Sequence, residues 1–450
     1  MSWQDKYKDK LISVEEAAKI VKSGNMVSFA FRDYPRDILF ALAERKDELR
    51  GVTIQSVSTE PYPWLQPGIE DSFKVVDYFP IRGFSRDGVW ERRIDWAPWI
   101  GGLGAEPNRY KAEPSRGKEF LHADVYMLKL TPPNEQGYCS FGCTLFYNPS
   151  AVRTAKTVIA EIDPKMIWTY GDYVHVSELD YLVEITPQDF DPYSVGLPLP
   201  PPDEAEKAAV IGANIASLVR DGDTIEVGTG TASEAVHEFL GSKNDLGLDT
   251  EVIYAKTLNL IKSGVITGKN KNVGQGKHRG TCIAVYPWDE DMQGCLAFAN
   301  HNPTLEMWGS ERQLNLARLA NVENLVAINN AVSIDLLGQA VIDHLGVLPF
   351  SGVGGQLEFA IGAHYGKGSR SITALMSTAK EGAASRIVPQ HELGSVIQLP
   401  MVYIDYLITE YGIVNLECKS RRERAEAIIS VADPKFRPEL MSAAKKMLYP

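Results

Sequence analysis

The sequence has few cysteines and no long apolar run. Five cysteines, at positions 139, 143, 282, 295 and 418, form an odd and scattered set. Such a set suits reduced thiols and not a disulfide framework. No apolar run is long enough to span a bilayer, and the polar, mixed-charge N-terminus lacks the apolar core of a signal peptide. We therefore expect a cytoplasmic protein that does not enter a membrane.

Basic residues and the common motifs for metals and nucleotides are also scarce. The 46 lysines and arginines against 58 acidic residues give a net charge of −12, which argues against a nucleic-acid binder. The eight histidines form no H-E-x-x-H pattern, and Cys139 and Cys143 lack a second ligand pair, so we expect no metal. The absence of G-x-x-x-x-G-K-[ST] and of G-x-S-x-G argues against a P-loop nucleotide triphosphatase and an α/β-hydrolase.

What the sequence does contain is an alternation of strand and helix patterns over 450 residues, enough for two or three domains. Periodicity predicts helices over 14–21, 37–42, 207–219 and 233–240, and a charged helix through 421–427. Apolar strands are predicted over 26–30, 125–131, 157–162, 224–227, 324–329 and 371–376. This order predicts an α/β protein with two open, parallel or mixed sheets flanked by helices.

The two halves of the chain are predicted to be related. The segment 21–27 matches the segment 219–225 in phase through a helix, a turn and a strand, which indicates an internal duplication. The copies differ after the strand, where Phe31-Arg32-Asp33 in the first half replaces Gly228-Thr229-Gly230 in the second. The proline-rich stretch 197–203 is a stiff connector, so we predict domains over 1–196 and 204–450.

The stretch 223–254 carries the chemistry. A β-branched strand ends at Gly228 and Gly230, where bare backbone lets N–H groups approach an anion. Glu251 is predicted to lie within a second strand, where a partly dehydrated carboxylate is reactive. The pattern thus suggests a nucleophilic carboxylate beside an oxyanion-binding loop. Alternatively the glycines are structural and Glu251 is an exposed strand residue. Asp249 would share its face, so that like-charge coupling raises one pKa or both carboxylates are solvated.

Three further features bear on the site. One is a second glycine loop, and the other two, Lys380 and the segment 83–99, each have two interpretations. The glycine loop 352–356 supplies a second row of N–H groups, and two such loops with one carboxylate can build an oxyanion pocket. Lys380 is either a cation for a phosphate or a surface lysine at a helix start. The loop-like segment 83–99 contains three tryptophans and three arginines. It is either a packed interdomain cover, with arginines stacked on rings, or a pocket wall that selects an anionic or bulky acid.

Several segments together identify a family. They are Pro132-Pro-Asn-Glu-Gln-Gly-Tyr138, Ile225-Glu-Val-Gly-Thr-Gly230, Leu246-Gly-Leu-Asp-Thr-Glu251, Ser351-Gly-Val-Gly-Gly-Gln356, Ser377-Thr-Ala-Lys380 with Ser385-Arg-Ile-Val-Pro389, and Ile408-Thr-Glu-Tyr-Gly412 with Lys419-Ser-Arg-Arg-Glu-Arg-Ala425. With these motifs nearly the whole chain resembles the acetyl-CoA hydrolase/transferase family of class I CoA-transferases. It is most similar to the 4-hydroxybutyrate and butyrate:acetyl-CoA branch.

The resemblance implies roles for particular residues. Glu251 would be the nucleophile that forms a glutamyl-CoA thioester, and the backbone N–H groups of Thr229 and Gly355 would form the oxyanion hole. The implied CoA-binding residues are Gly228, Thr229, Gly230, Thr231, Ala232, Asn329, Ser351, Gly355 and Lys380. The sequence departs from the family pattern at Ser333, where the family usually has glutamate, and in the segments 83–99 and 302–308.

The implied activity is a ping-pong CoA transfer from an acyl-CoA donor, expected to be acetyl-CoA, to a small carboxylic acid. This is a transferase of sulfur-containing groups in acyl-CoA metabolism. The CoA thioester is a substrate, no cofactor is required, and the family suggests a homo-oligomer. Two alternatives stay open. An acyl-CoA hydrolase would resolve the same thioester with water and release CoA without an acceptor acid, and a non-catalytic acyl-CoA binder would not depend on Glu251.

Overall fold

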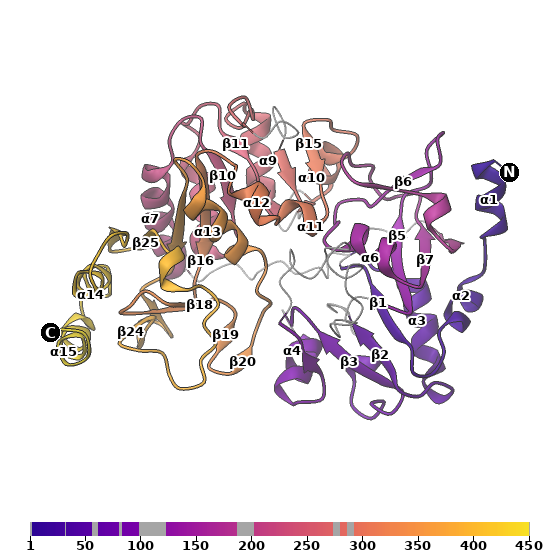
Figure 1. The fold of residues 1–450 in the computed structure, drawn as a ribbon, viewed down its shortest axis with the longest axis horizontal. Coiled ribbons are helices and arrows are strands. Elements are labelled where there is room, and N and C mark those ends of the chain that lie inside the picture. The colour runs from indigo at the N-terminus through magenta and orange to yellow at the C-terminus, as the bar shows by residue number, and fades with distance from the viewer. Residues whose placement is uncertain are drawn as a thin grey trace. The chain divides into compact units, whose positions relative to one another are not determined.

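The computed structural model describes residues 2–31, 33–55, 62–80, 83–98, 123–186, 202–272, 280–285 and 292–449. The chain divides into two compact units (Figure 1). The first comprises Met1–Gly196, Cys282–Gln313 and Pro349–Gly352, and the second comprises Leu197–Thr281, Leu314–Leu348 and Val353–Pro450. The units are therefore not two consecutive stretches. Of the predicted linker 197–203, residues 197–201 lie outside the described part, as do Arg32 and Trp99.

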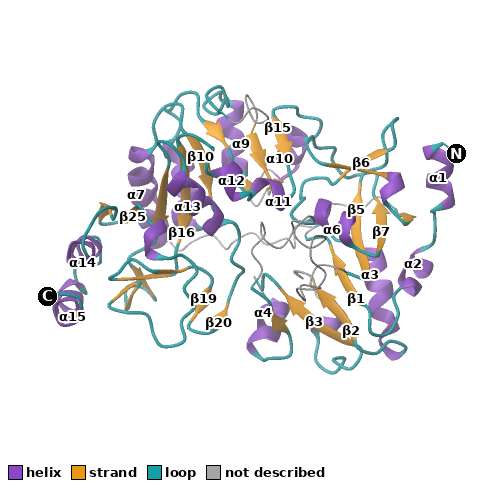
Figure 2. Ribbon diagram, in the orientation of Figure 1, coloured by secondary structure: helices purple, strands orange, loops and turns teal. Residues whose placement is uncertain are grey.

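The first unit contains a seven-stranded sheet in the order β4-β3-β2-β1-β5-β7-β9. Figure 2 labels its strands β3, β2, β1, β5 and β7. Each neighbouring pair in this sheet is parallel. The strands are β1 Met26–Phe29, β2 Val52–Gln55, β3 Phe73–Asp77, β4 Asp95–Trp96, β5 Val125–Leu130, β7 Thr157–Ile162 and β9 Tyr181–Glu184. Six consecutive buried residues in β5 are typical of a strand covered on both faces.

The second unit contains a six-stranded sheet in the order β11-β10-β16-β21-β25-β26. Its pairs are parallel except β25 with β26. The strands are β10 Thr224–Val227, β11 Gly247–Leu248, β16 Leu325–Asn330, β21 Arg370–Ala374, β25 Tyr406–Thr409 and β26 Gly412–Asn415. The order β11-β10-β16-β21-β25 repeats the order β2-β1-β5-β7-β9 of the first unit. The prediction of two related open α/β sheets is confirmed.

The duplicated turn repeats in detail. A helix, α2 Val14–Ile20 or α7 Pro202–Leu218, precedes the equivalent strand β1 or β10. Between helix and strand lie Gly24 with φ +79° and Gly222 with φ +80°. Both glycines occupy the left-handed region that side chains disfavour, so both copies require glycine there.

The remaining helices flank the two sheets or connect their strands. They are α1 Trp3–Asp9, α3 Arg36–Ala43, α4 Gly83–Trp90, α6 Asn148–Thr154, α8 Thr231–Glu234, α9 Ala255–Lys262, α10 Met292–Ala299, α11 Ser310–Gln313, α12 Leu316–Leu319, α13 Gln356–Tyr365, α14 Arg421–Ser430 and α15 Arg437–Met447, with 3-10 turns η1 Glu44–Asp47, η2 Pro63–Leu65, η5 Val176–Glu178, η6 Ala235–Phe239 and η8 Met401–Tyr403. The helix predicted over 233–240 instead starts at Thr231 and continues from Ala235 as 3-10 helix. The segment 83–90, predicted as loop, is helical.

Short strands make small additional pairings. They are β6 Tyr138–Ser140, β8 Tyr173–His175, β12 Val252–Ile253, β13 Gly280–Cys282, β14 Ala284–Val285, β15 Leu305–Met307, β17 Ser333–Asp335, β18 Ala340–Val341, β19 His344–Leu345, β20 Leu348–Pro349, β22 Thr378–Ala379, β23 Ala384–Ser385 and β24 Ile387–Val388. Among the described residues no helix is both long enough and apolar enough to cross a membrane.

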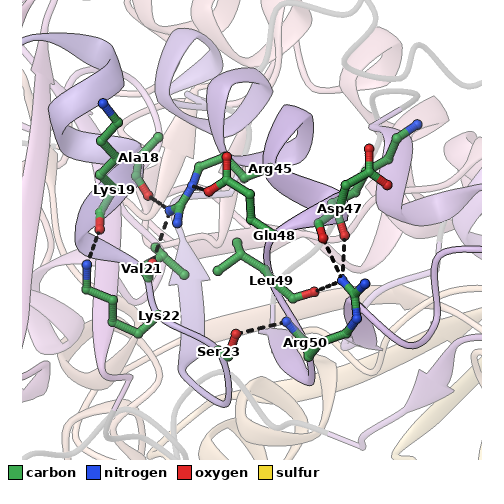
Figure 3. A network of polar contacts seen from close by, with 11 residues as sticks. Ala18, Lys19, Val21, Lys22, Ser23, Arg45, Asp47, Glu48, Leu49 and Arg50 are labelled. Atoms are coloured by element: carbon green, nitrogen blue, oxygen red, sulfur yellow. Dashed lines mark hydrogen bonds and ion pairs between the residues drawn. The ribbon is translucent and has the colours of Figure 1, made fainter.

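Arginines satisfy the carbonyl groups that helix ends leave without partners (Figure 3). Arg45 Nη1 donates to the carbonyl oxygens of Ala18 and Val21 at the end of α2, the latter at 3.0 Å. Arg50 Nη1 donates to the carbonyl oxygens of Lys46 and Asp47, both at 3.1 Å. A cation at a helix C-terminus also opposes the helix dipole. The Arg45 contacts tie the end of α2 to the turn after α3, and the Arg50 contacts close that turn.

Each unit has its own apolar core. In the first, α2 and α3 pack together and contribute buried side chains such as Leu39, which join Phe29 and Ile54 from the sheet. In the second, α14 and α15 pack together, and Ile428 and Leu440 are buried with Leu407 of β25. The cores hold the parallel strands rigid, so that residues at the ends of the strands have fixed positions.

Candidate active site

The glycine loop after β10 is held by side chains of the neighbouring strand. Gly228 N–H donates to the Ile328 carbonyl oxygen at 2.8 Å, which extends the pairing of β10 with β16. Asn330 Nδ2 donates to the Thr229 carbonyl oxygen at 3.0 Å, and Asn330 Oδ1 accepts from Ser233 N–H at 3.0 Å. Gly230 has φ +146° and precedes α8. The loop is thus built where a parallel sheet ends and a helix begins, as predicted.

The donors of this loop are not equivalent. Gly230 N–H donates to Glu234 Oε1 at 2.8 Å, so a side chain of the loop's own helix already occupies this donor. Thr229 is exposed, and its hydroxyl is hydrogen-bonded to the Tyr254 hydroxyl. Within the described part of the chain no hydrogen bond of the Thr229 N–H is found. Of the two, Thr229 N–H is therefore the donor that remains for a ligand.

Glu251 does not lie within a strand, contrary to the sequence prediction. The predicted strand over 246–254 is interrupted after β11 and resumes at β12, and Glu251 lies in the bend between them. Thr250 N–H turns away from β10 and donates to the Thr281 carbonyl oxygen at 3.0 Å. The bend leaves Glu251 half-buried between β11 and β12.

The carboxyl group of Glu251 accepts a backbone hydrogen bond from the second glycine loop. Gly355 N–H donates to Glu251 Oε2 at 2.9 Å. Burial raises the pKa of Glu251, and the Gly355 N–H opposes that rise. The carboxyl group is therefore partly dehydrated and fixed by one donor.

Gly355 is the N-cap of α13, so its N–H belongs to the positive end of a helix. A Cβ at Gly355 would lie 2.6 Å from Leu314 Cδ2 and 3.0 Å from Glu251 Oε2. The preceding residue, Gly354, has φ +62°. The predicted second row of N–H groups therefore places one donor on Glu251, and glycine is required for this close approach.

Asp249 is neither coupled to Glu251 nor solvated, which corrects both sequence expectations. Its carboxylate is fully buried and forms ion pairs with Arg318 at 2.7 Å and with Lys271 at 3.7 Å. Burial alone raises the pKa of Asp249, but the two cations lower it below its ordinary value. Asp249 is therefore a structural carboxylate that anchors the start of the bend.

Sequence reasoning missed Glu226, which is the second buried carboxyl group of this region. Glu226 lies in β10 and accepts a hydrogen bond from Asn329 Nδ2 at 2.7 Å. The pKa of Glu226 lies well above its ordinary value. Burial is the largest cause of this rise, and repulsion from the Glu251 carboxylate is the second. The available signal in the sequence was an acidic residue inside the predicted strand 224–227. In the structure all four positions of this strand are buried.

The other predicted CoA-binding residues do not all lie in the same unit as Glu251. Thr231 and Ala232 form the first turn of α8. Ser351 groups with the first unit, as does Gly352, whose Cβ would lie 2.0 Å from Phe79 Cδ2. The second unit thus assembles Glu251, the Gly228 loop, Asn329 and Gly355, without Ser351.

Lys380 is exposed and lies in the tight turn between β22 and β23, with φ +51°, and not at a helix start. No hydrogen bond or ion pair of its side chain is found among the described residues. Ser333 is half-buried at the start of β17, which pairs with β18 and β24.

The segment with tryptophans and arginines packs within the first unit where it is described. Trp90 Nε1 donates to the Pro349 carbonyl oxygen at 2.7 Å, and Arg86 lies 5.9 Å from the ring centroid of Phe350. Arg93 pairs with Glu91 at 2.7 Å. The first two contacts favour the interpretation as a packed cover.

One cluster has donor atoms that could hold a metal ion. His364, Asp405 and Glu417 bring one nitrogen and two carboxylate oxygens within 4.8 Å of one another. His364 and Glu417 are exposed and Asp405 is buried. None of the three contacts Glu251 through a hydrogen bond in the described structure, so the chemistry at Glu251 is considered without them.

A partly dehydrated glutamate whose carboxyl group accepts a backbone N–H at a helix start is compatible with nucleophilic catalysis by a carboxylate. Comparison with known proteins identifies the family to which the chain belongs. The N-terminal domain of the acetyl-CoA hydrolase/transferase family matches residues 1–188, and the C-terminal domain of that family matches residues 292–444. The chain belongs to the acetyl-CoA hydrolase/transferase family, and it is an enzyme of the CoA-transferase type.

Curated relatives match along almost the whole chain. A 4-hydroxybutyrate coenzyme A transferase of Clostridium kluyveri is 35% identical, with 99% of this chain and 100% of the relative covered. A succinyl-CoA:cyclohexane-1-carboxylate CoA transferase of Geobacter metallireducens is 31% identical, covering 99% and 97%. A butyryl-CoA:acetate CoA-transferase of Anaerostipes caccae is 29% identical, covering 99% and 98%.

Solved structures agree with the fold. RipA from Yersinia pestis superposes with a TM-score of 0.86 at 29% identity, with 99% of each chain covered. A 4-hydroxybutyrate CoA-transferase from Porphyromonas gingivalis superposes with a TM-score of 0.79 at 27% identity, with 99% of this chain and 100% of that chain covered. The predicted family, fold and enzyme class are therefore confirmed.

Proposed function

We propose that this protein transfers CoA from an acyl-CoA donor, expected to be acetyl-CoA, to a small carboxylic acid through a glutamyl-CoA thioester on Glu251. The observation that carries the proposal is the 2.9 Å hydrogen bond from Gly355 N–H to Oε2 of a partly dehydrated Glu251. Burial weakens the hydration of the carboxylate, which makes it a better nucleophile. The N–H fixes one oxygen and leaves the other to attack.

The reaction balances without a metal or a redox partner. A carboxylate oxygen of Glu251 attacks the thioester carbon of the donor, the C–S bond breaks, and CoA leaves as a thiolate. The thiolate then attacks the Glu251 carboxyl carbon of the resulting anhydride, which releases the donor acid and leaves a glutamyl-CoA thioester. An acceptor carboxylate reverses the two steps, so no net proton is consumed.

Backbone donors stabilise the charge that develops. When the thiolate attacks the Glu251 carboxyl carbon, negative charge grows on the oxygen that Gly355 N–H already contacts. Loss of one such donor typically costs ~3 kcal/mol of barrier. We assign Thr229 N–H as the second donor, because Gly230 N–H is taken by Glu234. Gly228, Thr229, Gly230, Thr231, Ala232, Asn329, Ser351, Gly355 and Lys380 remain the proposed CoA-binding residues.

The acceptor is proposed to be a small carboxylic acid. The names of the relatives include 4-hydroxybutyrate, cyclohexane-1-carboxylate and acetate, which share one carboxylate on a small aliphatic body. A carboxylate of this kind can form the anhydride with Glu251 and leave again with little change in energy. A cytoplasmic location and a homo-oligomeric state remain predictions from the sequence.

Intact-protein mass after incubation with acetyl-CoA, without an acceptor acid, tests the proposal. We expect a CoA-sized mass gain in the wild type and none in Glu251→Ala or Glu251→Gln. Free CoA is measured in the same tube. Steady release of CoA without an acceptor would favour the hydrolase. Binding of acetyl-CoA without mass gain or release, unaffected by Glu251→Ala, would indicate the non-catalytic binder.

A further inference from the structure

Glu226 and Asn329 lie on the same face of the second sheet, at the end of two neighbouring strands. In the parallel register Val227 is opposite Ile328, so the next positions, Gly228 and Asn329, are also opposite each other. Side chains alternate along a strand, so Glu226 points to the same face as position 228. Glu226 and Asn329 can therefore meet in front of Gly228.

The missing side chain of Gly228 makes room for this contact. A Cβ at Gly228 would lie 2.0 Å from Asn329 Oδ1, so the amide occupies the space that any other residue would fill. From this position Asn329 Nδ2 donates to Glu226 Oε2 at 2.7 Å. The amide is therefore hydrogen-bonded to a buried carboxyl group through Nδ2, and its Oδ1 lies against the bare backbone of the glycine loop.

The charges around Glu226 make its protonation state important. Asp249 is neutralised by Arg318 and Lys271, whereas Glu251 has no ion pair among the described residues. The Tyr254 hydroxyl, a neutral group, also belongs to this cluster: burial raises the pKa of Tyr254 most, followed by the charge of Glu234, and Glu251 and Glu226 add smaller rises. A second ionised carboxylate here would repel Glu251 and the oxyanions that form on it. Burial and the neighbouring Glu251 carboxylate raise the pKa of Glu226 and favour its protonated form, while the hydrogen bonds from the Asn329 amide and the Ile328 backbone oppose the rise without cancelling it.

We propose that Glu226 is a positioning residue of the thioester exchange, which holds the Asn329 amide against Gly228 and remains protonated beside Glu251. The inference rests on the proposed function, because it assigns Glu226 a role in the reaction of Glu251. By binding Asn329, the carboxyl group of Glu226 supports one side of the glycine loop that carries Thr229 N–H. Because Glu226 is neutral, the site contains a single reactive carboxylate, that of Glu251.

This role predicts an alkaline limit to the reaction. Thioester formation requires ionised Glu251, so its rate rises with pH. As pH rises further, Glu226 loses its proton, and the added negative charge opposes both the ionised nucleophile and the developing oxyanion. The rate then falls. Glutamine at position 226 keeps the shape and the acceptor oxygen for Asn329 but cannot ionise, so this fall disappears.

The experiment measures the single-turnover rate of the CoA-sized mass gain with acetyl-CoA between pH 5 and 10. We expect Glu226→Gln to keep the wild-type rate at pH 7 within about threefold and to lack the alkaline fall. Glu226→Ala frees the Asn329 amide, and loss of geometry of this kind slows reactions about 10- to 100-fold. The double variant Glu226→Ala/Asn329→Ala should be no slower than the slower single variant, because both residues act through one contact.

Glu161→Gln is the matched control, since Glu161 is a buried glutamate of the first unit that accepts a backbone N–H at 2.8 Å. Its pH profile should follow the wild type.

Absence of a mass gain in the wild type would overturn the proposed function itself. If the wild type reacts, a Glu226→Ala rate equal to wild type overturns only the positioning role. An alkaline fall that persists in Glu226→Gln, or a Glu226→Gln rate as low as that of Glu226→Ala, also overturns it. Should Glu226→Ala fail to fold, the pH profile of Glu226→Gln decides.

Discussion

Arg318 and Asp249 form a two-point ion pair, with Nη1 2.7 Å from Oδ2 and Nη2 2.8 Å from Oδ1. The carboxylate is fully buried and lies two residues before Glu251. Asp249 N–H also donates to the Ile225 carbonyl oxygen at 3.0 Å, which ties the same residue to β10. Side-chain and backbone contacts together fix the bend from which Glu251 projects.

Arg318→Ala should strongly destabilise the protein. It leaves a buried carboxylate with the more distant Lys271, at 3.7 Å, and breaking a buried pair in this way costs about 3–5 kcal/mol. The free energy of unfolding in urea measures the loss. Lys256→Ala is the control, because its pair with Glu238 at 2.8 Å is exposed and should contribute at most about 1 kcal/mol. Equal losses in the two variants would contradict the structural role of Asp249.

Gly355→Ala should slow thioester formation about 10- to 100-fold. The new Cβ would lie 3.0 Å from Glu251 Oε2 and 2.6 Å from Leu314 Cδ2, so the carboxyl group must move away from its donor. The rate of the CoA-sized mass gain with acetyl-CoA measures the effect, and adding Leu314→Ala should restore part of it. A Cβ at Gly241 would meet no atom within 4 Å, so Gly241→Ala should react like the wild type. A wild-type rate for Gly355→Ala would refute the assigned contact.

The rate of thioester formation should depend on pH through Glu251. Burial raises the pKa of Glu251 and the Gly355 N–H lowers it, with a net rise. Because the proposed nucleophile is the ionised carboxylate, the rate should increase with pH, and the midpoint of this acid limb should lie above the ordinary glutamate pKa. Single-turnover mass measurements between pH 4 and 7 test this. A midpoint at or below the ordinary value would show that the carboxyl group is hydrated like a surface glutamate.

Glu161→Gln should make the stability less dependent on pH. Burial raises the pKa of Glu161 from 4.5 to about 8, opposed by the Ile38 N–H. The folded protein therefore keeps a proton that the unfolded chain releases between these values. Its stability falls as pH rises through this window, by at most about 1.4 kcal/mol per pH unit. Urea unfolding at pH 5, 6, 7 and 8 should give a flatter profile for Glu161→Gln. The exposed variant Glu135→Gln should keep the wild-type slope; an unchanged slope in Glu161→Gln as well would contradict the prediction.

Local sequence patterns determined much of the fold. Apolar and β-branched runs placed β10 at Thr224–Val227 and β7 at Thr157–Ile162, as predicted. The repeated phase of the two halves corresponds to Gly24 and Gly222, whose φ angles agree within one degree. These features depend on residues close in sequence, whose backbone and side-chain preferences act before any long-range contact forms. For the same reason the family motifs could be recognised in the chain.

Only the tertiary structure decided how the site is assembled. Gly355 N–H reaches Glu251 across 104 residues, and Asn329 reaches Glu226 across 103. No periodicity predicts such contacts, because they arise where separate parallel strands align and their carboxyl ends come together. The same packing interrupts the predicted strand at Glu251, since Asp249 and Thr250 are bound by β10 and by Thr281. The sequence by itself singled out Glu251 as the proposed nucleophile, whereas the folded sheet decided which backbone donor faces Glu251 and which second carboxyl group lies beside it.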